Sequence, residues 1–104
     1  MTEYPAIFHP DLCPTHPGEV LREDVLPAVK RPKAEIARLL GISRQLLYDI
    51  LDEKKPVSPA VAARLGKLFG NGAGFWIRLQ ANHDAWHAER DIDTSNIPTI
   101  GAAA

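Results

Sequence analysis

The chain has 104 residues, of which 45% are hydrophobic and 24% charged, and its formal net charge is −1. These values fit one domain with a modest core and exclude a disordered or collagen-like chain. No apolar run is long enough to cross a bilayer, and the N-terminus lacks the basic region of a signal peptide. The single cysteine, Cys13, excludes an internal disulfide framework. We therefore expect a cytoplasmic protein.

The charges are distributed unevenly along the chain. Residues 28–67 carry nine basic and four acidic side chains, a local charge of +5, whereas the other residues together carry −6. A basic centre between acidic ends is typical of a phosphate-binding surface with a separate surface for a basic partner. Chance clustering in so short a chain is the alternative interpretation.

The N-terminal quarter combines a proline-rich segment with a first helix. Three prolines in residues 1–15 favour an extended lead-in. A helix is predicted over residues 16–26, because Pro17 suits the first helical position and Glu19 favours the positive end of the helix dipole. Residues 27–32 begin and end with proline, and we expect a basic loop there, with its last proline opening the next helix.

Two short helices joined by a tight turn are predicted over residues 35–51. Gly41 can end the first helix in a left-handed conformation, and Ser43 is a good N-cap for the second. Apolar residues at helical spacing form one face of each helix: Ile36, Ala37 and Leu40 in the first, and Leu47, Ile50 and Leu51 in the second. The pair has the pattern of a helix-turn-helix.

Two further helices complete the predicted fold. Ser58 and Pro59 mark the start of a helix over residues 58–69, and a last helix is predicted over residues 74–90. We expect an all-α, compact five-helix domain over residues 16–92, followed by a flexible tail at residues 93–104. The last helix carries aromatic and aliphatic residues along one side: Phe75, Trp76, Leu79, His83 and Trp86.

The second helix of the central pair has an outer face suited to a DNA major groove. This face holds Arg44, Gln45, Tyr48 and Asp49. Arginine pairs bidentately with guanine, and glutamine with adenine. Lys54 and Lys55 follow where a backbone phosphate would lie. Amphipathic helix pairs also occur in domains that bind no DNA, so a helical protein-interaction module stays open.

Three segments together resemble one family. HPGEVLRED (16–24), EIARLLGISRQLLYDIL (35–51) and FWIRLQANHDAW (75–86) are similar to the HigA-type antitoxins of bacterial toxin–antitoxin modules, which belong to the Xre-like helix-turn-helix repressors. The resemblance implies a lambda-repressor-like fold and a cytoplasmic, nucleoid-associated protein that is not an enzyme. It also implies a homodimer on palindromic, double-stranded operator DNA, and a cognate HigB/RelE-like toxin that cleaves messenger RNA.

The resemblance implies specific roles for residues on and around the central pair. The base-reading residues would be Arg44, Gln45, Tyr48 and Asp49, and the phosphate contacts Lys33, Ser43, Lys54 and Lys55. Many relatives have glutamine at the position of Lys33, and smaller Thr or Ser at those of Leu46 and Tyr48. The operator sequence therefore cannot be transferred from the family.

Two further surfaces are predicted outside the central pair. The last helix has more apolar surface than a small core needs, and we expect a dimer interface made of Phe75, Trp76, Leu79 and Trp86. An aromatic cage for a ligand is the weaker alternative there. The acidic residues Glu19, Glu23 and Asp24 are candidates for contact with a basic toxin, although they also suit a solvated helix face.

Two patterns that suggest metal binding are present, and we expect no metal at either. His83, Asp84 and His87 resemble a zincin helix, but Asp84 replaces the usual glutamate and no third ligand is evident. His9, Cys13 and His16 match no ligand spacing. The sequence predicts no cofactor and no catalytic residue, with Cys13 as a spectator thiol. A stand-alone Xre-family regulator without a toxin remains an alternative to the antitoxin.

Overall fold

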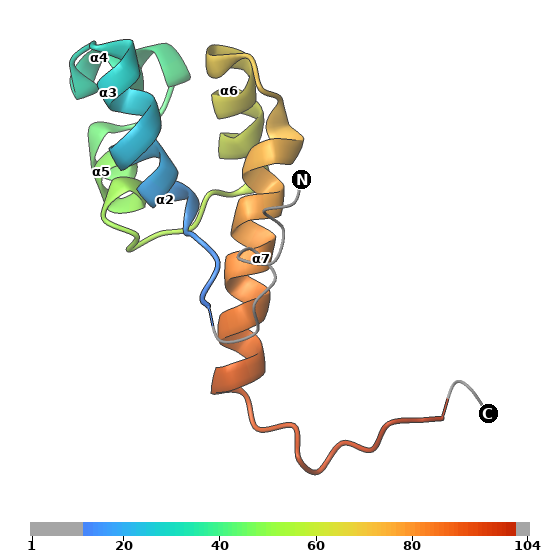
Figure 1. Cartoon of the computed structure of the whole chain (residues 1–104). Coiled ribbons are helices and arrows are strands. Elements are labelled where there is room, and N and C mark those ends of the chain that lie inside the picture. Colours follow the sequence, from blue (N-terminus) through green and yellow to red (C-terminus); the bar gives the residue numbers. More distant parts are fainter. Residues whose placement is uncertain (1–11, 102–104) are drawn as a thin grey trace.

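The computed structural model describes residues 12–101; most of the expected lead-in and residues 102–104 lie outside that range. The described residues form five helices and no strand, which confirms the predicted all-α class. The first helix comprises α2 (Pro17–Val20), the wider turn η1 (Leu21–Val25) and α3 (Leu26–Val29). It is followed by α4 (Lys33–Leu40), α5 (Arg44–Leu51), α6 (Pro59–Phe69) and α7 (Ala73–Asp91). Figure 1 shows this order.

The first helix extends three residues further than predicted, so the expected loop at residues 27–32 is wrong for its first half. Pro27 has no N–H and would break a regular α-helix. Within η1 the chain widens, and the Leu26 N–H donates to the Leu21 carbonyl five residues earlier. This wide turn accommodates Pro27, and the helix ends at Lys30, whose φ of 61° is left-handed.

The core is formed by side chains from every helix. The faces predicted for the central pair are buried as expected. Trp76 is the largest of the fully buried side chains. The buried hydrophobic residues are Leu21, Leu26, Ile36, Ala37, Leu40, Leu47, Ile50, Leu51, Val57, Val61, Ala62, Leu65 and Trp76.

The first helix lies directly against the central pair. A Cβ atom placed on Gly18 would lie 1.8 Å from the Ile50 carbonyl oxygen, so only glycine allows α2 to approach α5 this closely. Arg22 donates from Nη1 to the Leu51 carbonyl at 2.5 Å, at the end of α5. The HPGEVLRED segment therefore helps to hold α5 in place.

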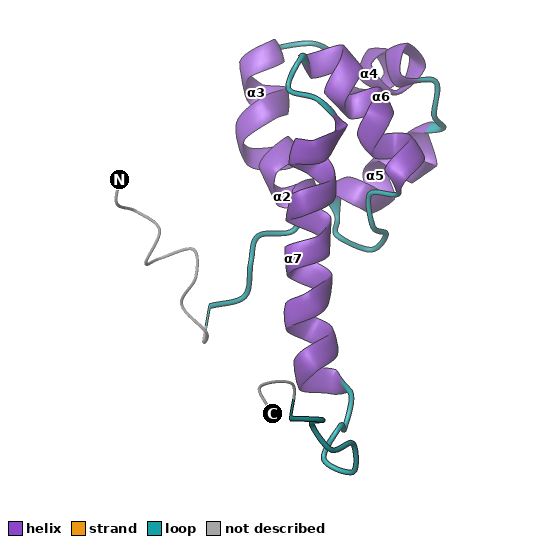
Figure 2. Cartoon of the chain, turned by 90° about the vertical axis from the view of Figure 1, so that its right-hand side faces the viewer, coloured by secondary structure: helices purple, strands orange, loops and turns teal. Residues whose placement is uncertain are grey.

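Helix α7 is the longest element and reaches beyond the other helices. Its first half packs against α6, and its second half extends away from the bundle (Figures 1 and 2). The segment just before α2 runs beside this second half. Residues 92–101 are exposed and irregular. Within residues 12–101, no helix has both the length and the apolar character needed to cross a membrane.

Candidate DNA-binding surface and a histidine–cysteine cluster

Local hydrogen bonds fix both the start of α5 and the turn before it. Ser43 accepts a hydrogen bond from the Leu46 N–H at 3.0 Å, which is the predicted N-cap. Gly41 ends α4 with a φ of 74°, in the left-handed region that favours glycine. Arg64 of α6 donates to the Leu40 carbonyl at 2.8 Å, so a third helix secures the turn.

Three of the four expected base-reading side chains are exposed on α5. Arg44 and Gln45 are exposed in the first turn, and Tyr48 is 43% exposed. Asp49 is half-buried and accepts a hydrogen bond from Gln45 Nε2 at 2.9 Å. Its second carboxylate oxygen lies 3.7 Å from Lys55 Nζ. Asp49 is thus engaged with two neighbours of the same surface.

The expected phosphate-binding residues lie at helix starts and in the loop after α5. Lys33 is the first residue of α4, and Ser43 precedes α5; both are exposed. Lys54 and Lys55 are exposed, and both of their backbone N–H groups donate to the Asp49 carbonyl. Helix N-termini favour phosphate, because their free N–H groups and dipole attract anions.

The loop after α5 is held by Gln80 of α7, which lies in the segment FWIRLQANHDAW but for which the sequence predicted no role of its own. Gln80 is 7% exposed; its Oε1 accepts from the Val57 N–H at 2.7 Å, and its Nε2 donates to Asp84 at 2.8 Å. Its position four residues after Trp76, on the same side of the helix, is the feature of the sequence that indicates a buried residue here.

The expected dimer interface needs one correction. Trp76 has no exposed surface, and its Nε1 donates to Asn71 at 2.9 Å, so it belongs to the core and is not available to a second copy. Phe75 is 37% exposed, and Leu79 and Trp86 are half-buried. The Arg90 guanidinium stacks over the Trp86 ring, 3.8 Å from its centroid.

The acidic candidates for toxin contact are all exposed on the first helix. Glu19 lies on α2, and Glu23 and Asp24 lie on η1. Glu23 accepts a hydrogen bond from Arg22 Nε at 2.9 Å. Neither Glu19 nor Asp24 belongs to an ion pair found in residues 12–101. Part of the negative charge of this face therefore has no basic neighbour within that range.

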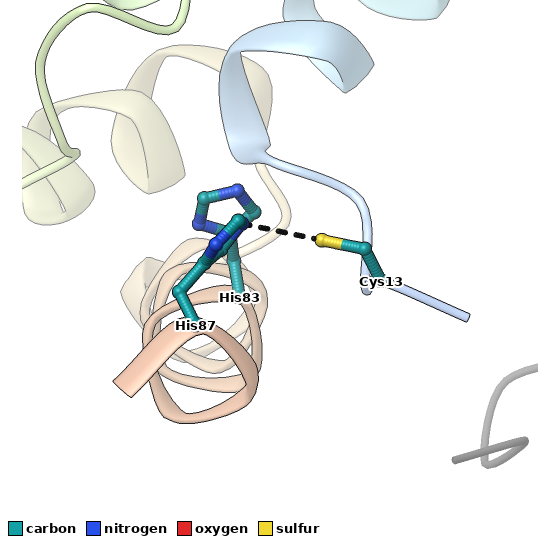
Figure 3. Close-up of side chains that lie close together, drawn as sticks. All are labelled: Cys13, His83 and His87. Atoms are coloured by element: carbon teal, nitrogen blue, oxygen red, sulfur yellow. Dashed lines mark hydrogen bonds between the residues drawn. The ribbon is translucent and has the colours of Figure 1, made fainter. Parts of the chain in front are cut away.

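A cluster of three metal-binding side chains lies outside the α5 surface. The ligand atoms of Cys13, His83 and His87 lie within 4.8 Å of one another, and Figure 3 shows Cys13 facing the two histidines of α7. The Cys13 Sγ and His87 Nε2 atoms are 3.4 Å apart. The expectation that no third ligand lies near His83 and His87 was wrong, because Cys13 is remote in the sequence and adjacent in the fold.

His16, which belongs to the second histidine pattern, caps α2 and also lies against the cluster, with its ring centroid 4.8 Å from that of His83. His16 Nδ1 accepts a hydrogen bond from the Gly18 N–H at 2.8 Å and caps α2. Burial, with a further contribution from His83, lowers the pKa of His16, which keeps Nδ1 available as an acceptor. His9 lies outside the described residues.

No family model matches the chain, but several known proteins do. The HTH-type transcriptional regulator YbaQ of Escherichia coli K12 is 31% identical over 81 residues, which are 78% of this chain and 72% of YbaQ. The structure of the Pseudomonas aeruginosa antitoxin HigA with the higBA promoter matches with a TM-score of 0.76 at 32% identity, covering 88% of this chain and 99% of that one. Antitoxin GraA in complex with its operator matches with a TM-score of 0.79 at 32% identity, covering 88% and 95%.

Proposed function

Because the chain belongs to the HigA-type antitoxins of the Xre-like helix-turn-helix family, we propose that it is a DNA-binding antitoxin and not an enzyme. It binds a palindromic operator as a homodimer, represses its own toxin–antitoxin operon and neutralises a cognate HigB/RelE-like toxin. The observation that carries this proposal is the outer face of α5, where Arg44, Gln45 and Tyr48 are exposed on a capped helix.

In this proposal, side chains in the first turn of α5 contact the base edges. The Gln45 amide has two N–H donors and one acceptor, and Asp49 uses one donor. The second donor and the oxygen remain for bidentate pairing with adenine, while Arg44 pairs with guanine. Asp49 orients Gln45 and Lys55 through these contacts, and its part in base reading stays a prediction.

Phosphate contacts surround this reading face. Lys33 and Ser43 stand at the N-terminal ends of α4 and α5, where helix dipoles add to the attraction of phosphate. Lys54 and Lys55, which follow the C-terminal end of α5, contact phosphates of the DNA backbone. The local charge of +5 over residues 28–67 supports this assignment, although the whole chain carries −1.

A dimer follows from the length of DNA that one helix can read. A single recognition helix covers too few base pairs for a repressor, so two copies occupy half-sites about 34–36 Å apart. We assign the dimer interface to the exposed parts of Phe75, Leu79 and Trp86 on α7. Trp76 is removed from this set because of its burial.

The toxin contact is assigned to the acidic face of the first helix. HigB/RelE-like toxins hold RNA, so they are basic, and Glu19, Glu23 and Asp24 offer a complementary charge away from α5. DNA binding and toxin binding then use separate residues. This separation makes the two activities independently testable.

A stand-alone transcription regulator is the second candidate. The observation that favours it is the similarity to YbaQ, whose name describes an HTH-type regulator and mentions no toxin. Both candidates bind DNA, whereas a helical protein-interaction module does not. A steep loss of affinity with salt separates the two DNA-binding candidates from that module.

The deciding experiment is co-expression with the product of the neighbouring reading frame. An antitoxin restores growth and co-purifies with that product. Arg44→Ala should lose repression of the operon and still protect cells, whereas Glu23→Arg with Asp24→Arg should slow toxin association at low salt and leave operator binding intact.

The matched control for these charge reversals is Glu89→Arg with Asp91→Arg, at the C-terminal end of α7. These changes should leave the association rate with the toxin unchanged. If the neighbouring product is neither toxic nor bound while operator binding persists, the antitoxin assignment fails and the stand-alone regulator replaces it.

A further inference from the structure

The cluster of Cys13, His83 and His87 has no part in DNA reading, yet its composition is that of a metal site. His83 and His87 lie one helical turn apart on α7, so both rings project from the same side of the helix. Cys13 approaches them from the segment before α2 (Figure 3). We propose that these three side chains bind a divalent transition-metal ion, with Zn²⁺ as the expected occupant.

The spacing of the donor atoms fits tetrahedral coordination. Zn²⁺ binds imidazole nitrogen at about 2.0–2.1 Å and thiolate sulfur at about 2.3 Å, which places adjacent nitrogen and sulfur ligands about 3.5 Å apart. The Cys13 Sγ to His87 Nε2 distance is 3.4 Å, and all three donors lie within 4.8 Å of one another. A small rotation of the side chains closes the site around the ion.

One ring nitrogen of His83 needs a partner. His83 Nδ1 is buried and has no hydrogen-bond partner among the described residues. The Asp84 carboxylate lies 3.6 Å away, too far for a hydrogen bond. If Nδ1 ligates the metal, it is satisfied directly. If Nε2 ligates, Nδ1–H turns to Asp84, as in the carboxylate–histidine–metal arrangement of many zinc sites.

The donor set selects the class of ion. One thiolate and two imidazoles suit borderline-soft ions such as Zn²⁺ and Co²⁺, whereas Mg²⁺ and Ca²⁺ require oxygen ligands. Three protein ligands leave the fourth tetrahedral position to water. Binding also requires loss of the thiol proton, because thiolate is the ligand form of cysteine.

A metal at this position links two parts of the fold that are distant in the chain. Cys13 and His87 are separated by 74 positions, and the segment that carries Cys13 leads into α2. A bound ion therefore fastens this segment to the projecting half of α7, and closes a long loop that is open in the unfolded chain. Because the unfolded chain does not hold the three ligands together, metal binding stabilises the fold.

The test is a Co²⁺ titration of the full, metal-stripped chain, followed by absorbance. We expect one ion per chain, tetrahedral d–d bands and a thiolate-to-cobalt charge-transfer band, all removed by excess Zn²⁺. The charge-transfer band can come only from Cys13, the single cysteine. Zn²⁺ should also raise the Tm by at least about 5 °C, and Mg²⁺ should not.

Variants identify the ligands. Cys13→Ser should abolish the charge-transfer band, and His87→Ala should weaken binding more than the roughly 10–100-fold typical of losing an outer partner. Asp24→Asn is the control, because Asp24 is an exposed carboxylate on η1 that lies outside the cluster. Its metal affinity should change less than about 3-fold.

Circular dichroism of each metal-free variant separates loss of binding from loss of folding. Cys13 is exposed and His87 half-buried, so both variants should keep the helical spectrum of the unaltered chain. Absence of the charge-transfer band in the unaltered chain overturns the proposal. So does a stoichiometry of one ion per two chains, or an affinity that Cys13→Ser and His87→Ala leave unchanged while both remain folded.

Discussion

At the scale of single residues, a few polar side chains hold the elements around α5 in place. Arg64 and Arg22 donate to the carbonyls that end α4 and α5, and Gln80 fixes the loop that follows. Each contact joins residues that are far apart in the sequence. These contacts set the orientation of the exposed face that the proposal assigns to DNA.

Gln80→Ala should destabilise the fold by about 1–3 kcal/mol, because it leaves the buried Val57 N–H without a partner. Urea unfolding followed by circular dichroism measures this loss. Gln45→Ala is the matched control, since Gln45 is exposed and its removal should change stability by less than about 0.5 kcal/mol. Equal stabilities of the two variants would show that the Gln80–Val57 hydrogen bond contributes nothing.

Gly18→Ala should also destabilise the fold, by about 1–3 kcal/mol or more, since the new methyl group meets the Ile50 backbone carbonyl. Gly74→Ala provides the comparison within a helix. A Cβ there meets only the end of the flexible Arg78 side chain, and alanine is the better helix former. Thermal unfolding should therefore rank Gly74→Ala above Gly18→Ala, and the reverse order would contradict the close approach of α2 to α5.

At the scale of elements, the sequence predicted those helices whose ends carry local signals. Ser43 and Ser58 both cap the helices that they were expected to start, and Gly41 and Gly70 end helices in left-handed conformations. The end of the first helix was missed, because Pro27 normally signals a boundary, whereas here the wide turn η1 accommodates it and the helix continues to Val29.

The same distinction applies to the exposed surface. Features that follow from helical spacing were predicted, whereas features that depend on tertiary packing were not. Periodicity alone identified the outer face of α5, and Arg44, Gln45 and Tyr48 are indeed exposed. It could not distinguish core from interface on α7, where Trp76 is buried and Phe75 is exposed. Nor could it bring Cys13 to His87, because their contact depends on how the first helix docks.

The prediction about dimer formation concerns helix α7. Trp86→Ala should weaken the dimer by about 2 kcal/mol, or roughly 30-fold in Kd, as expected for an aromatic residue at the centre of an interface. Light scattering and sedimentation measure the shift towards monomer. Ile92→Ala is the control, because Ile92 is 61% exposed and lies just beyond α7. A dimer that tolerates Trp86→Ala would place the interface elsewhere.

At the scale of the whole molecule, basic and acidic residues are separated along the chain, and the proposal assigns a different partner to each group. The basic centre of +5 includes both helices of the central pair, whereas the acidic residues assigned to the toxin lie on the first helix. A near-neutral chain can then bind DNA through one surface and a basic protein through another. Salt should weaken both contacts, because both depend on exposed charges.

Lys54→Ala tests the electrostatic part of this arrangement. Removing one phosphate contact should weaken binding to operator and to unrelated DNA alike, and lower the slope of log K against log salt by about one. Titrations at several salt concentrations give this slope. Lys67→Ala, on the exposed side of α6, is the matched lysine control and should leave the slope unchanged. A Lys54→Ala slope equal to that of the unaltered chain would remove Lys54 from the phosphate contacts.

The most direct test of the central claim is the operator preference of the unaltered chain and of Gln45→Ala, measured by fluorescence anisotropy on the DNA upstream of its own reading frame. The account predicts that Gln45→Ala loses about 1–3 kcal/mol on this DNA, loses preference at one base pair in each half-site, and keeps its affinity for unrelated DNA. An unchanged preference, or equal affinity of the unaltered chain for operator and unrelated DNA, would contradict base reading by α5.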